Sequence, residues 1–197
     1  LKEQLDHLFR TRGRESFPDV WSARDAYIDV ILDRRPRAVR QFLKLLAHAD
    51  LDDSQVQDAL ELMELQRHAL LMYTSCGWFF DDISGIEATQ VIQYAGRVIQ
   101  LAQKLFGDQQ IREQFLEMLS QARRNIPEKG DGRTIYESAV QPAAVDLGQV
   151  AAHYAVSSLF EDYAEDTRIY CYEVSREEYE RQTEGAAQMA VGRARLT

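Results

Sequence analysis

The chain has 197 residues, a hydrophobic fraction of 45% and a formal net charge of −9. A length of this order suits one domain, or one domain with part of another, and allows a substantial buried core. The acidic balance argues against a nucleic-acid partner, because proteins that bind phosphate backbones usually carry a basic stripe. No apolar run approaches the about 20 residues that a membrane-spanning helix needs, so we expect no membrane partner.

Basic residues are dense in one stretch only. That stretch contains Arg34, Arg35, Arg37, Arg40 and Lys44. It flanks the start of a predicted helix, where charged side chains commonly face solvent. We therefore interpret it as a solvated helix face rather than as an anion-binding site.

The two cysteines, Cys76 and Cys171, lie far apart in the sequence. They form neither a CxxC pair nor a zinc-ligand spacing. We expect two reduced, partly buried thiols in a cytoplasmic protein.

Apolar residues recur at helical spacing over most of the chain. In the first fifty residues the pattern predicts three helices: one around residues 5–9, one capped by Ser22, and one with Pro36 in its first turn. Tyr27, Val30 and Phe42 are expected on the inner faces of these helices.

A fourth, long helix is predicted to begin at a cap provided by Asp53 or Ser54. Its inner positions from Val56 onward are apolar except for one charge, Arg67. We expect the helix to continue into residues 73–80 and to end or distort near Gly77. Glycine lowers helix propensity by ~1 kcal/mol relative to alanine, which is the reason for that expectation.

Four further helices are predicted after this point. Residues 84–87 read Ser-Gly-Ile-Glu, a capping-box pattern, and start a helix that Gly107 ends. The next helix is closed by Pro127, and a shorter one lies around residues 134–140. Pro142 is expected to open the last helix, which would run to residue 159 or 160.

The pattern changes after residue 166. Residues 168–174 and 190–196 are rich in β-branched and aromatic residues or alternate in polarity, and a charged stretch, 175–185, separates them. We predict two strands joined by a charged connection, as an irregular hairpin. The predicted fold is mainly α: a multi-helix bundle over residues 1–166, and a short β-segment over 167–197 that packs on the bundle or begins a β-domain.

The densest group of chemistry-bearing residues lies between residues 61 and 87. The candidate ligand-binding residues are Arg67, His68, Tyr73, Trp78, Asp81 and Asp82. Aromatic side chains beside a few well-placed polar groups are typical of ligand pockets, and carboxylates accept hydrogen bonds from hydroxyl groups. This combination suits the recognition of a sugar.

A structural interpretation of the same residues stays open. Trp78 and the two phenylalanines after it could belong to the core, because aromatic side chains dominate burial energetics. Asp81 and Asp82 could stand near the N-terminus of the next helix, where negative charge is favoured. Arg67 could pair with either aspartate or with Glu64.

Other chemistries are disfavoured by spacing. A carboxylate-bridged metal site in a helical bundle uses Glu-x-x-His motifs, whereas Glu64 and His68 are four residues apart. Ser75 lacks a Gly-x-Ser-x-Gly frame, and Cys76 has no identified catalytic partner. We predict no catalytic residue, no metal ligand and no cofactor in this chain.

The central run of the chain resembles a known family. Glu64-Leu-Gln-Arg-His68 and Leu71-Met-Tyr-Thr-Ser-Cys-Gly-Trp-Phe-Phe-Asp-Asp-Ile-Ser-Gly-Ile-Glu87 are similar to domain of unknown function 3536. That domain follows the catalytic barrel in proteins similar to glycoside hydrolase family 57. The similarity continues through residues 125–128, 130–136 and 168–172, and covers the chain from about residue 21 to its end.

The resemblance implies that the chain is a helix-rich piece of a larger carbohydrate-active enzyme. In that family a distorted (β/α) barrel carries the two catalytic carboxylates, and a helical bundle covers the cleft. The implied partners are an upstream barrel of the same polypeptide and an oligo- or polysaccharide, above all an α-glucan. We expect this piece to be inactive alone, while the parent hydrolyses or transfers glucan.

Two functions follow from the resemblance. In the first, the chain is an accessory domain that helps to form the sugar cleft, and Trp78 is the counterpart of a tryptophan-containing motif near the substrate. This function predicts that Trp78 is partly exposed in a groove lined by Asp81, Asp82, Arg67 or His68. In the second, the chain is a structural domain that packs on the barrel, which predicts that Trp78 is buried or lies on a broad apolar patch.

Overall fold

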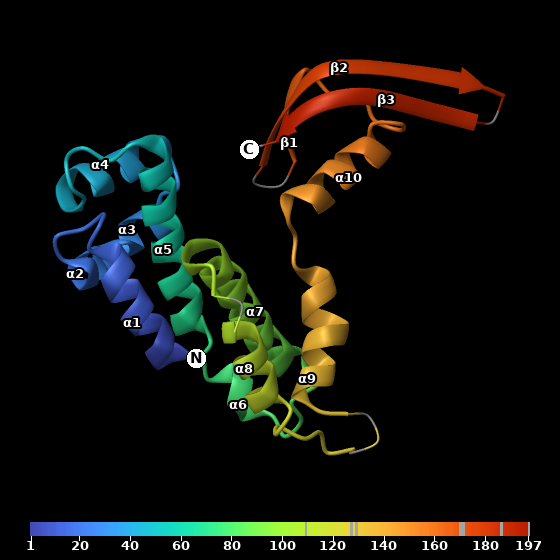
Figure 1. The fold of residues 1–197 in the computed structure, drawn as a ribbon. Helices are drawn as coiled ribbons and strands as arrows, with labels where there is room; N and C mark the ends of the chain where they lie inside the picture. Colours follow the sequence, from blue (N-terminus) through green and yellow to red (C-terminus); the bar gives the residue numbers. More distant parts are fainter. Residues whose placement is uncertain (109, 127, 129, 170–171, 186, 197) are drawn as a thin grey trace. The chain divides into compact units, whose positions relative to one another are not determined.

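The computed structural model describes residues 1–197 except residues 109, 127, 129, 170, 171, 186 and 197. The chain divides into two compact units, Leu1–Ala143 and Ala144–Thr197. Unit 1 is helical, and unit 2 combines one helix with a three-stranded antiparallel sheet (Figure 1). The predicted fold class, mainly helical with a β-segment near the C-terminus, is confirmed.

Unit 1 consists of helices with a short π-helix and a 3-10 turn at its end. Its elements are α1 (Lys2–Gly13), α2 (Val20–Ala26), α3 (Ile28–Leu32), α4 (Pro36–Leu46), α5 (Asp53–Leu71), α6 (Cys76–Phe79), α7 (Ile86–Phe106), α8 (Gln110–Leu119), α9 (Gly132–Ile135), the π-helix Tyr136–Val140 and the 3-10 helix Gln141–Ala143.

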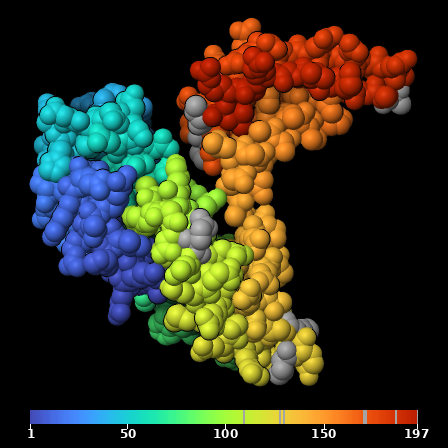
Figure 2. Space-filling view, in the orientation of Figure 1, coloured from blue at the N-terminus to red at the C-terminus, as the bar shows by residue number. Residues whose placement is uncertain are grey.

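Two apolar clusters hold unit 1 together. The first joins α1 to α5 and includes Phe9, Phe42 and Leu62, which are nearly or fully buried. The second joins α5, α7 and α8 and includes Val98 and Leu116. Figure 2 shows the N-terminal residues, in blue, directly against the cyan residues near position 50. Each large apolar side chain buried in this way contributes about 1.5–3 kcal/mol to stability.

Aspartate side chains cap the starts of α2 and α5, at positions that differ from the predicted caps. Asp19, not Ser22, caps α2: its carboxylate accepts two backbone N–H groups, and the hydroxyl of Ser22 donates to it at 2.7 Å. Asp52 caps α5 in a capping box, so a cap at Asp53 or Ser54 is wrong. A carboxylate in extended backbone just before the first turn reaches the unpaired N–H groups, which explains both positions.

The long helix α5 ends at Leu71 and does not continue into residues 73–80. The hydroxyl of Thr74 donates to the carbonyl of Leu71 at 3.0 Å, and the backbone N–H of Thr74 bonds the same carbonyl. Such bonds tighten the last turn and satisfy carbonyls that the helix leaves open. The following residues form the separate four-residue helix α6, which contains Gly77.

The capping box predicted at residues 84–87 does not form. Gly85 precedes α7 and no side chain caps it, because Ser84 is engaged elsewhere: its N–H donates to Asp82 and its hydroxyl accepts from Arg124. Gly107 ends α7 as predicted, with a φ of 67° that glycine adopts without strain.

The later helices differ from the prediction in type or length. The helix expected around residues 134–140 is α9 continued by the π-helix. Pro142 lies in the 3-10 helix rather than at the start of the next α-helix. That helix, α10 (Leu147–Ser157), begins after Asp146, which forms a capping box with Gln149. Pro127, the predicted stop of α8, lies outside the described residues.

Unit 2 contains α10 and the strands β1 (Asp166–Ile169), β2 (Tyr172–Glu184) and β3 (Ala187–Leu196), in the order β1-β2-β3. The charged stretch 175–185 was predicted to connect two strands; instead most of it lies within β2. The charged side chains of this stretch are largely exposed, and its backbone pairs with β3.

An apolar cluster joins the helix and the sheet of unit 2. Val150 and Tyr154 of α10 pack with Ile169 and Val174 of the sheet. The sequence pattern predicts a boundary at residue 166, which would group this helix with the preceding ones. In the structure the division falls between Ala143 and Ala144, so α10 belongs with the strands.

Candidate functional site

The helix α6 exposes the aromatic segment Trp78–Phe80. Trp78 is 74% exposed, Phe79 73% and Phe80 55%, and none of the residues of α6 is buried. The rings of Phe79 and Phe80 meet edge to face at 5.2 Å. Large aromatic side chains at this exposure leave apolar surface in water, which is typical of a surface that contacts a ligand or another protein part.

Gly77 allows α6 to lie directly on α7. A Cβ atom at Gly77 would lie 2.6 Å from a methyl carbon of Val91, closer than real Cβ atoms come. A glycine at a close backbone approach has a packing role. The aromatic segment is thus held on a firm support although its side chains are exposed.

The two adjacent aspartates have different surroundings. The carboxylate of Asp82 accepts the backbone N–H of Ser84 at 2.8 Å. This bond, a bond from the Ser84 side chain and the charge of Arg124 together hold the pKa of Asp82 below its ordinary value. Asp81 is exposed, and among the described residues its carboxylate forms no hydrogen bond or ion pair. Asp82 therefore shapes the turn before α7, whereas Asp81 can accept from an external donor.

Arg67 pairs with Glu64 rather than with Asp81 or Asp82. Its guanidinium donates to Glu64 Oε2 at 3.1 Å. Glu64 Oε1 also accepts from the hydroxyl of Tyr27 at 2.7 Å and from Arg34 at 2.6 Å. We call these four residues, Tyr27, Arg34, Glu64 and Arg67, the Glu64 network. It ties α5 to the segment that joins α2 and α4.

The ionisation of the Glu64 network follows from these contacts. Burial tends to raise the pKa of Glu64, but hydrogen bonds from Tyr27 and Arg34 outweigh it and hold that pKa below its ordinary value. Burial and the neighbouring carboxylate raise the pKa of Tyr27 well above its ordinary value, so the phenol stays protonated and donates. Sequence reasoning missed Tyr27 and Arg34. The usable signal was an inward-facing tyrosine, whose hydroxyl needs a partner when buried.

His68 lies one turn from Glu64 and is largely buried. Its Nδ1 lies 2.8 Å from the backbone carbonyl of Glu64, which favours the tautomer with a proton on Nδ1. Burial lowers the pKa of His68, and the charges of Arg67 and Arg97 act in the same direction. The imidazole is therefore neutral at neutral pH, with its other nitrogen able to accept a hydrogen bond.

The aromatic segment and His68 both lie against α7. The ring of His68 meets Tyr94 edge to face at 6.2 Å, and Gly77 lies against Val91. Val91 and Tyr94 are three residues apart on one helix, so the two contacts are about 4.5 Å apart along its axis. The predicted site residues thus form two groups along α7: one contains His68, and the other contains the aromatic segment of α6.

Tyr73 is 66% exposed and lines an apolar cleft of about 380 Å³. Met72, Val91, Phe115 and Met118 form much of this cleft, which includes neither Trp78 nor His68. The groove expected to combine Trp78 with Arg67 or His68 is therefore not this cleft.

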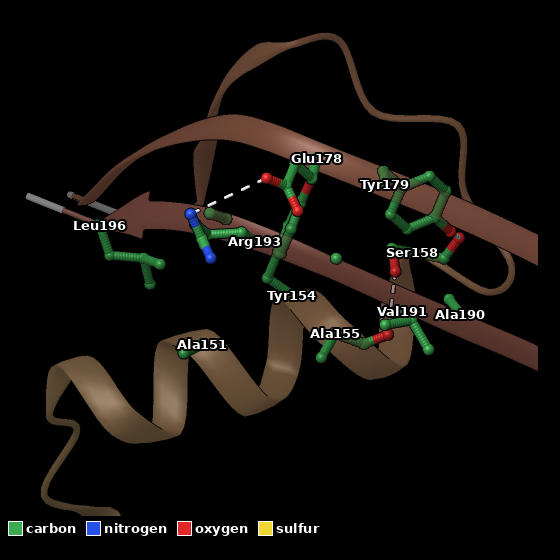
Figure 3. Close-up of a pocket in the computed structure, with 12 residues that line it drawn as sticks. Ala151, Tyr154, Ala155, Ser158, Glu178, Tyr179, Ala190, Val191, Arg193 and Leu196 are labelled. Carbon is green, nitrogen blue, oxygen red and sulfur yellow. Dashed lines mark hydrogen bonds and ion pairs between the residues drawn. The ribbon is translucent and has the colours of Figure 1, made fainter.

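Unit 2 has a cleft of its own, which the sequence did not indicate. It measures about 200 Å³ and lies between α10 and the strands β2 and β3 (Figure 3). Small residues face each other across it, Ala155 from α10 and Ala190 from β3 among them. Tyr154 rises from α10 toward the strands, and its hydroxyl is buried without a hydrogen-bond partner among the described residues. At one end Arg193 and Glu178 approach to 3.8 Å.

Cys76 is exposed, although a partly buried thiol was expected, because it begins the exposed helix α6. Its Sγ lies 3.4 Å from the hydroxyl of Thr74. Cys171 lies outside the described residues. In the basic stretch near residue 36, Arg35, Arg37, Arg40 and Lys44 are exposed as expected, whereas Arg34 pairs with Glu64.

Among the residues that the structure describes, no group of three or more histidine, cysteine, aspartate or glutamate side chains could hold a metal ion. Of the helices described, none combines the length and the hydropathy needed to cross a membrane.

Comparisons with known proteins give one positive result. Neither the curated proteins nor the solved structures contain a match to this chain. The family model described as Domain of unknown function (DUF3536) matches residues 1–197. Since the match spans the whole chain, the chain belongs to the DUF3536 family.

Proposed function

We propose that this chain is an accessory helical domain of a carbohydrate-active enzyme similar to glycoside hydrolase family 57. In this proposal the aromatic segment Trp78–Phe80 forms part of the wall of the saccharide cleft. The catalytic carboxylates lie on an upstream barrel of the same polypeptide, and the substrate is an oligo- or polysaccharide of the α-glucan type. The parent enzyme hydrolyses or transfers glucan, and this chain has no turnover alone.

The observation that carries the proposal is the exposure of Trp78 on a rigid support. At 74% exposure, its indole offers a broad apolar face. The next residues add two more exposed rings and the uncommitted carboxylate of Asp81. A flat aromatic face beside a hydrogen-bond acceptor is the chemical combination that a sugar ring requires, because the ring has an apolar C–H face and hydroxyl edges.

The other candidate sites have secondary roles in this proposal. Tyr73 lines a separate apolar cleft, and His68 lies against Tyr94 of α7; in this proposal both would contact saccharide units next to the one on Trp78. Arg67 contributes by holding Glu64, and Asp82 by shaping the turn that follows the aromatic segment. We assign none of these residues a catalytic step.

A second candidate function has its own supporting observation. Three consecutive exposed aromatic residues, with Ile86 81% exposed close by in the sequence, form apolar surface of the kind that packs against another protein part. In this alternative the chain is a structural domain, the segment docks on the barrel, and no residue touches the saccharide.

Trp78 can report directly on saccharide binding. The chain contains two tryptophans, so Trp21→Phe leaves Trp78 as the single indole emitter. Titration with maltoheptaose should change the emission intensity of Trp78 in a saturable manner. The matched control is Trp78→Phe, in which only Trp21 emits; that residue packs on Phe9 and should not respond. An emission from Trp78 that stays unchanged over the whole maltoheptaose titration of this chain contradicts the proposal.

The parent enzyme separates the two candidate functions. If Trp78 contacts glucan, Trp78→Ala should raise KM about tenfold, equivalent to about 1.4 kcal/mol, without lowering Tm. If the segment docks on the barrel, the same change should lower Tm and leave KM unchanged. Phe160→Ala, which removes a ring of unit 2 that is 78% exposed and has no role in either candidate function, is the matched control for both measurements.

A further inference from the structure

A third cleft lies in unit 1, between α5 and the elements α3 and α4. Its volume is about 420 Å³. Apolar side chains from three elements form its floor: Val30 of α3, Val39 of α4, and Val56 and Leu60 of α5. Neither Trp78 nor Tyr73 lines it. The cleft is therefore distinct from the aromatic segment and independent of the function proposed for it.

Polar residues of α5 form one wall of this cleft. Gln57, Glu61 and Glu64 follow one another at spacings of four and three residues, so they share a helix face. Glu61 Oε1 accepts from Lys104 at 2.5 Å and from Gln57 at 2.9 Å. Glu61 Oε2 is buried and accepts no hydrogen bond from the described residues. A buried carboxylate oxygen without a donor is uncommon in folded proteins and calls for a donor from outside.

The charges around the cleft balance. Three carboxylates line it: Asp53, Glu61 and Glu64. The cations that line it or pair with its glutamates among the described residues are Arg34, Arg67 and Lys104. An added anion would meet three carboxylates, and an added cation would compete with Lys104 for Glu61. A neutral ligand avoids both penalties.

We propose that this cleft binds a small neutral polyhydroxyl compound, which donates a hydroxyl hydrogen bond to Glu61 and accepts one from Arg34. Arg34 donates to Tyr27 and Glu64 through Nη1. Its guanidinium has further N–H groups, which can donate to a ligand. The apolar floor takes the C–H face of the ligand, and the polar wall takes its hydroxyl edge.

The Glu64 network makes the cleft a prepared site. Glu64 is held by three donors and keeps Arg34 in place, so the guanidinium needs no large movement when a ligand arrives. Lys104, from α7, holds Glu61 in the same way. Groups fixed before binding lose less conformational freedom on binding, which favours affinity.

The test uses the whole chain with glucose as the probe. The methyl resonances of Val30, Val39 and Val56 should shift saturably in NMR spectra as glucose is added. In Glu61→Leu the apparent Kd for this shift should rise about tenfold, the effect of one lost hydrogen bond to a charged group. Glu3→Leu removes the same charge at an exposed position of α1 and should leave Kd unchanged.

A second variant keeps the test decisive if Glu61→Leu does not fold. Val56→Phe narrows the cleft from its floor and should abolish the shifts at Val30 and Val39. Circular dichroism confirms that each variant keeps its helical content. Shifts that survive in Val56→Phe would overturn the proposal.

Three further results would overturn it, and they are distinguishable. Shifts confined to Trp78 and its neighbours would place glucose at the aromatic segment, which supports the function proposed above and rejects this cleft. No shift at any residue would reject the cleft. Equal shifts with ethylammonium chloride would show a cation site rather than a polyhydroxyl site.

Discussion

The hydroxyl of Tyr27 gives the sharpest stability prediction. Tyr27 is 3% exposed, and its hydroxyl donates to Glu64 at 2.7 Å. Tyr27→Phe removes this single oxygen without changing the packing of the ring. A hydrogen bond to a charged group contributes about 1.5–3 kcal/mol net. Because Glu64 keeps Arg34 and Arg67 as donors, we expect the lower end of this range, about 1.5 kcal/mol of lost unfolding free energy.

Tryptophan emission can measure the loss in unit 1 alone. Trp21 packs in the same apolar cluster as Tyr27, so in a Trp78→Phe background its emission reports the unfolding of this core. With a urea m-value of about 2 kcal/mol/M, the midpoint should fall by about 0.7 M. The control is Tyr73→Phe, which removes a hydroxyl from a side chain that is 66% exposed.

Two results would refute this reasoning. The first is an unfolding free energy for Tyr27→Phe within about 0.3 kcal/mol of that for Tyr73→Phe, the usual error of such comparisons. The second is strict additivity of Tyr27→Phe and Glu64→Gln, since residues joined by a strong hydrogen bond should couple in a double-mutant cycle.

Four other outcomes are expected. Burial tends to raise the pKa of Glu64, but its hydrogen-bond donors hold that pKa below its ordinary value. Glu64 therefore stabilises the fold fully above its unfolded pKa of about 4.3, and this stabilisation is lost as the pH falls through its folded pKa. The unfolding free energies measured in urea at pH 7 and pH 3 should differ less in Glu64→Gln than in the unsubstituted chain. Gly192→Ala should destabilise unit 2 by about 1–3 kcal/mol in thermal denaturation, because a Cβ there would collide with the backbone oxygen of Glu178. Tyr154→Phe should leave the Tm of unit 2 unchanged or raise it, since a buried hydroxyl without a partner costs about 1–3 kcal/mol. Asp52→Ala should lower the unfolding free energy of unit 1 by about 1 kcal/mol through loss of the cap of α5.

Each of these outcomes has a result that contradicts it. An equal pH response in Glu64→Gln would remove Glu64 from the acid sensitivity of the fold. Wild-type stability in Gly192→Ala would show that the two strands can separate locally at that point. A lower Tm in Tyr154→Phe would reveal an acceptor for its hydroxyl, and an unchanged stability in Asp52→Ala would show that α5 is fixed by packing alone.

The sequence predicted helices well and helix ends less well. Apolar spacing identifies a helix because it reflects the buried face, as Val98 and Leu116 illustrate. A helix start depends on which of several neighbouring polar residues adopts extended backbone. Here that residue is Asp19, and Ser22 lies within the helix. The end of α5 was missed because it rests on a side chain, that of Thr74, that turns back onto the helix.

The site was predicted in composition but not in arrangement. Arg67 and His68 are neighbours on one helix, so their proximity follows from sequence spacing. The choice of Glu64 over Asp81 or Asp82 as the partner of Arg67 depends on where the chain turns after α5, which spacing does not determine. Tyr27 is 37 residues from Glu64 in the sequence, and only the tertiary fold joins them.

The strand β2 is longer than its neighbour β1, and this difference leaves part of one edge of β2 open to pairing with another chain. β1 pairs with β2 only as far as Ser175, so in the described residues the rest of β2 has one partner strand, β3. An unpaired strand edge is a template for sheet extension between molecules. Glu177 and Glu178 of this region pair with Arg195 and Arg193 of β3, and Glu180 adds a further exposed carboxylate, so a strand that docked here would have to desolvate charged groups. Replacing these three glutamates by threonine should raise the tendency of the protein to form intermolecular β-sheet, measured as thioflavin T binding.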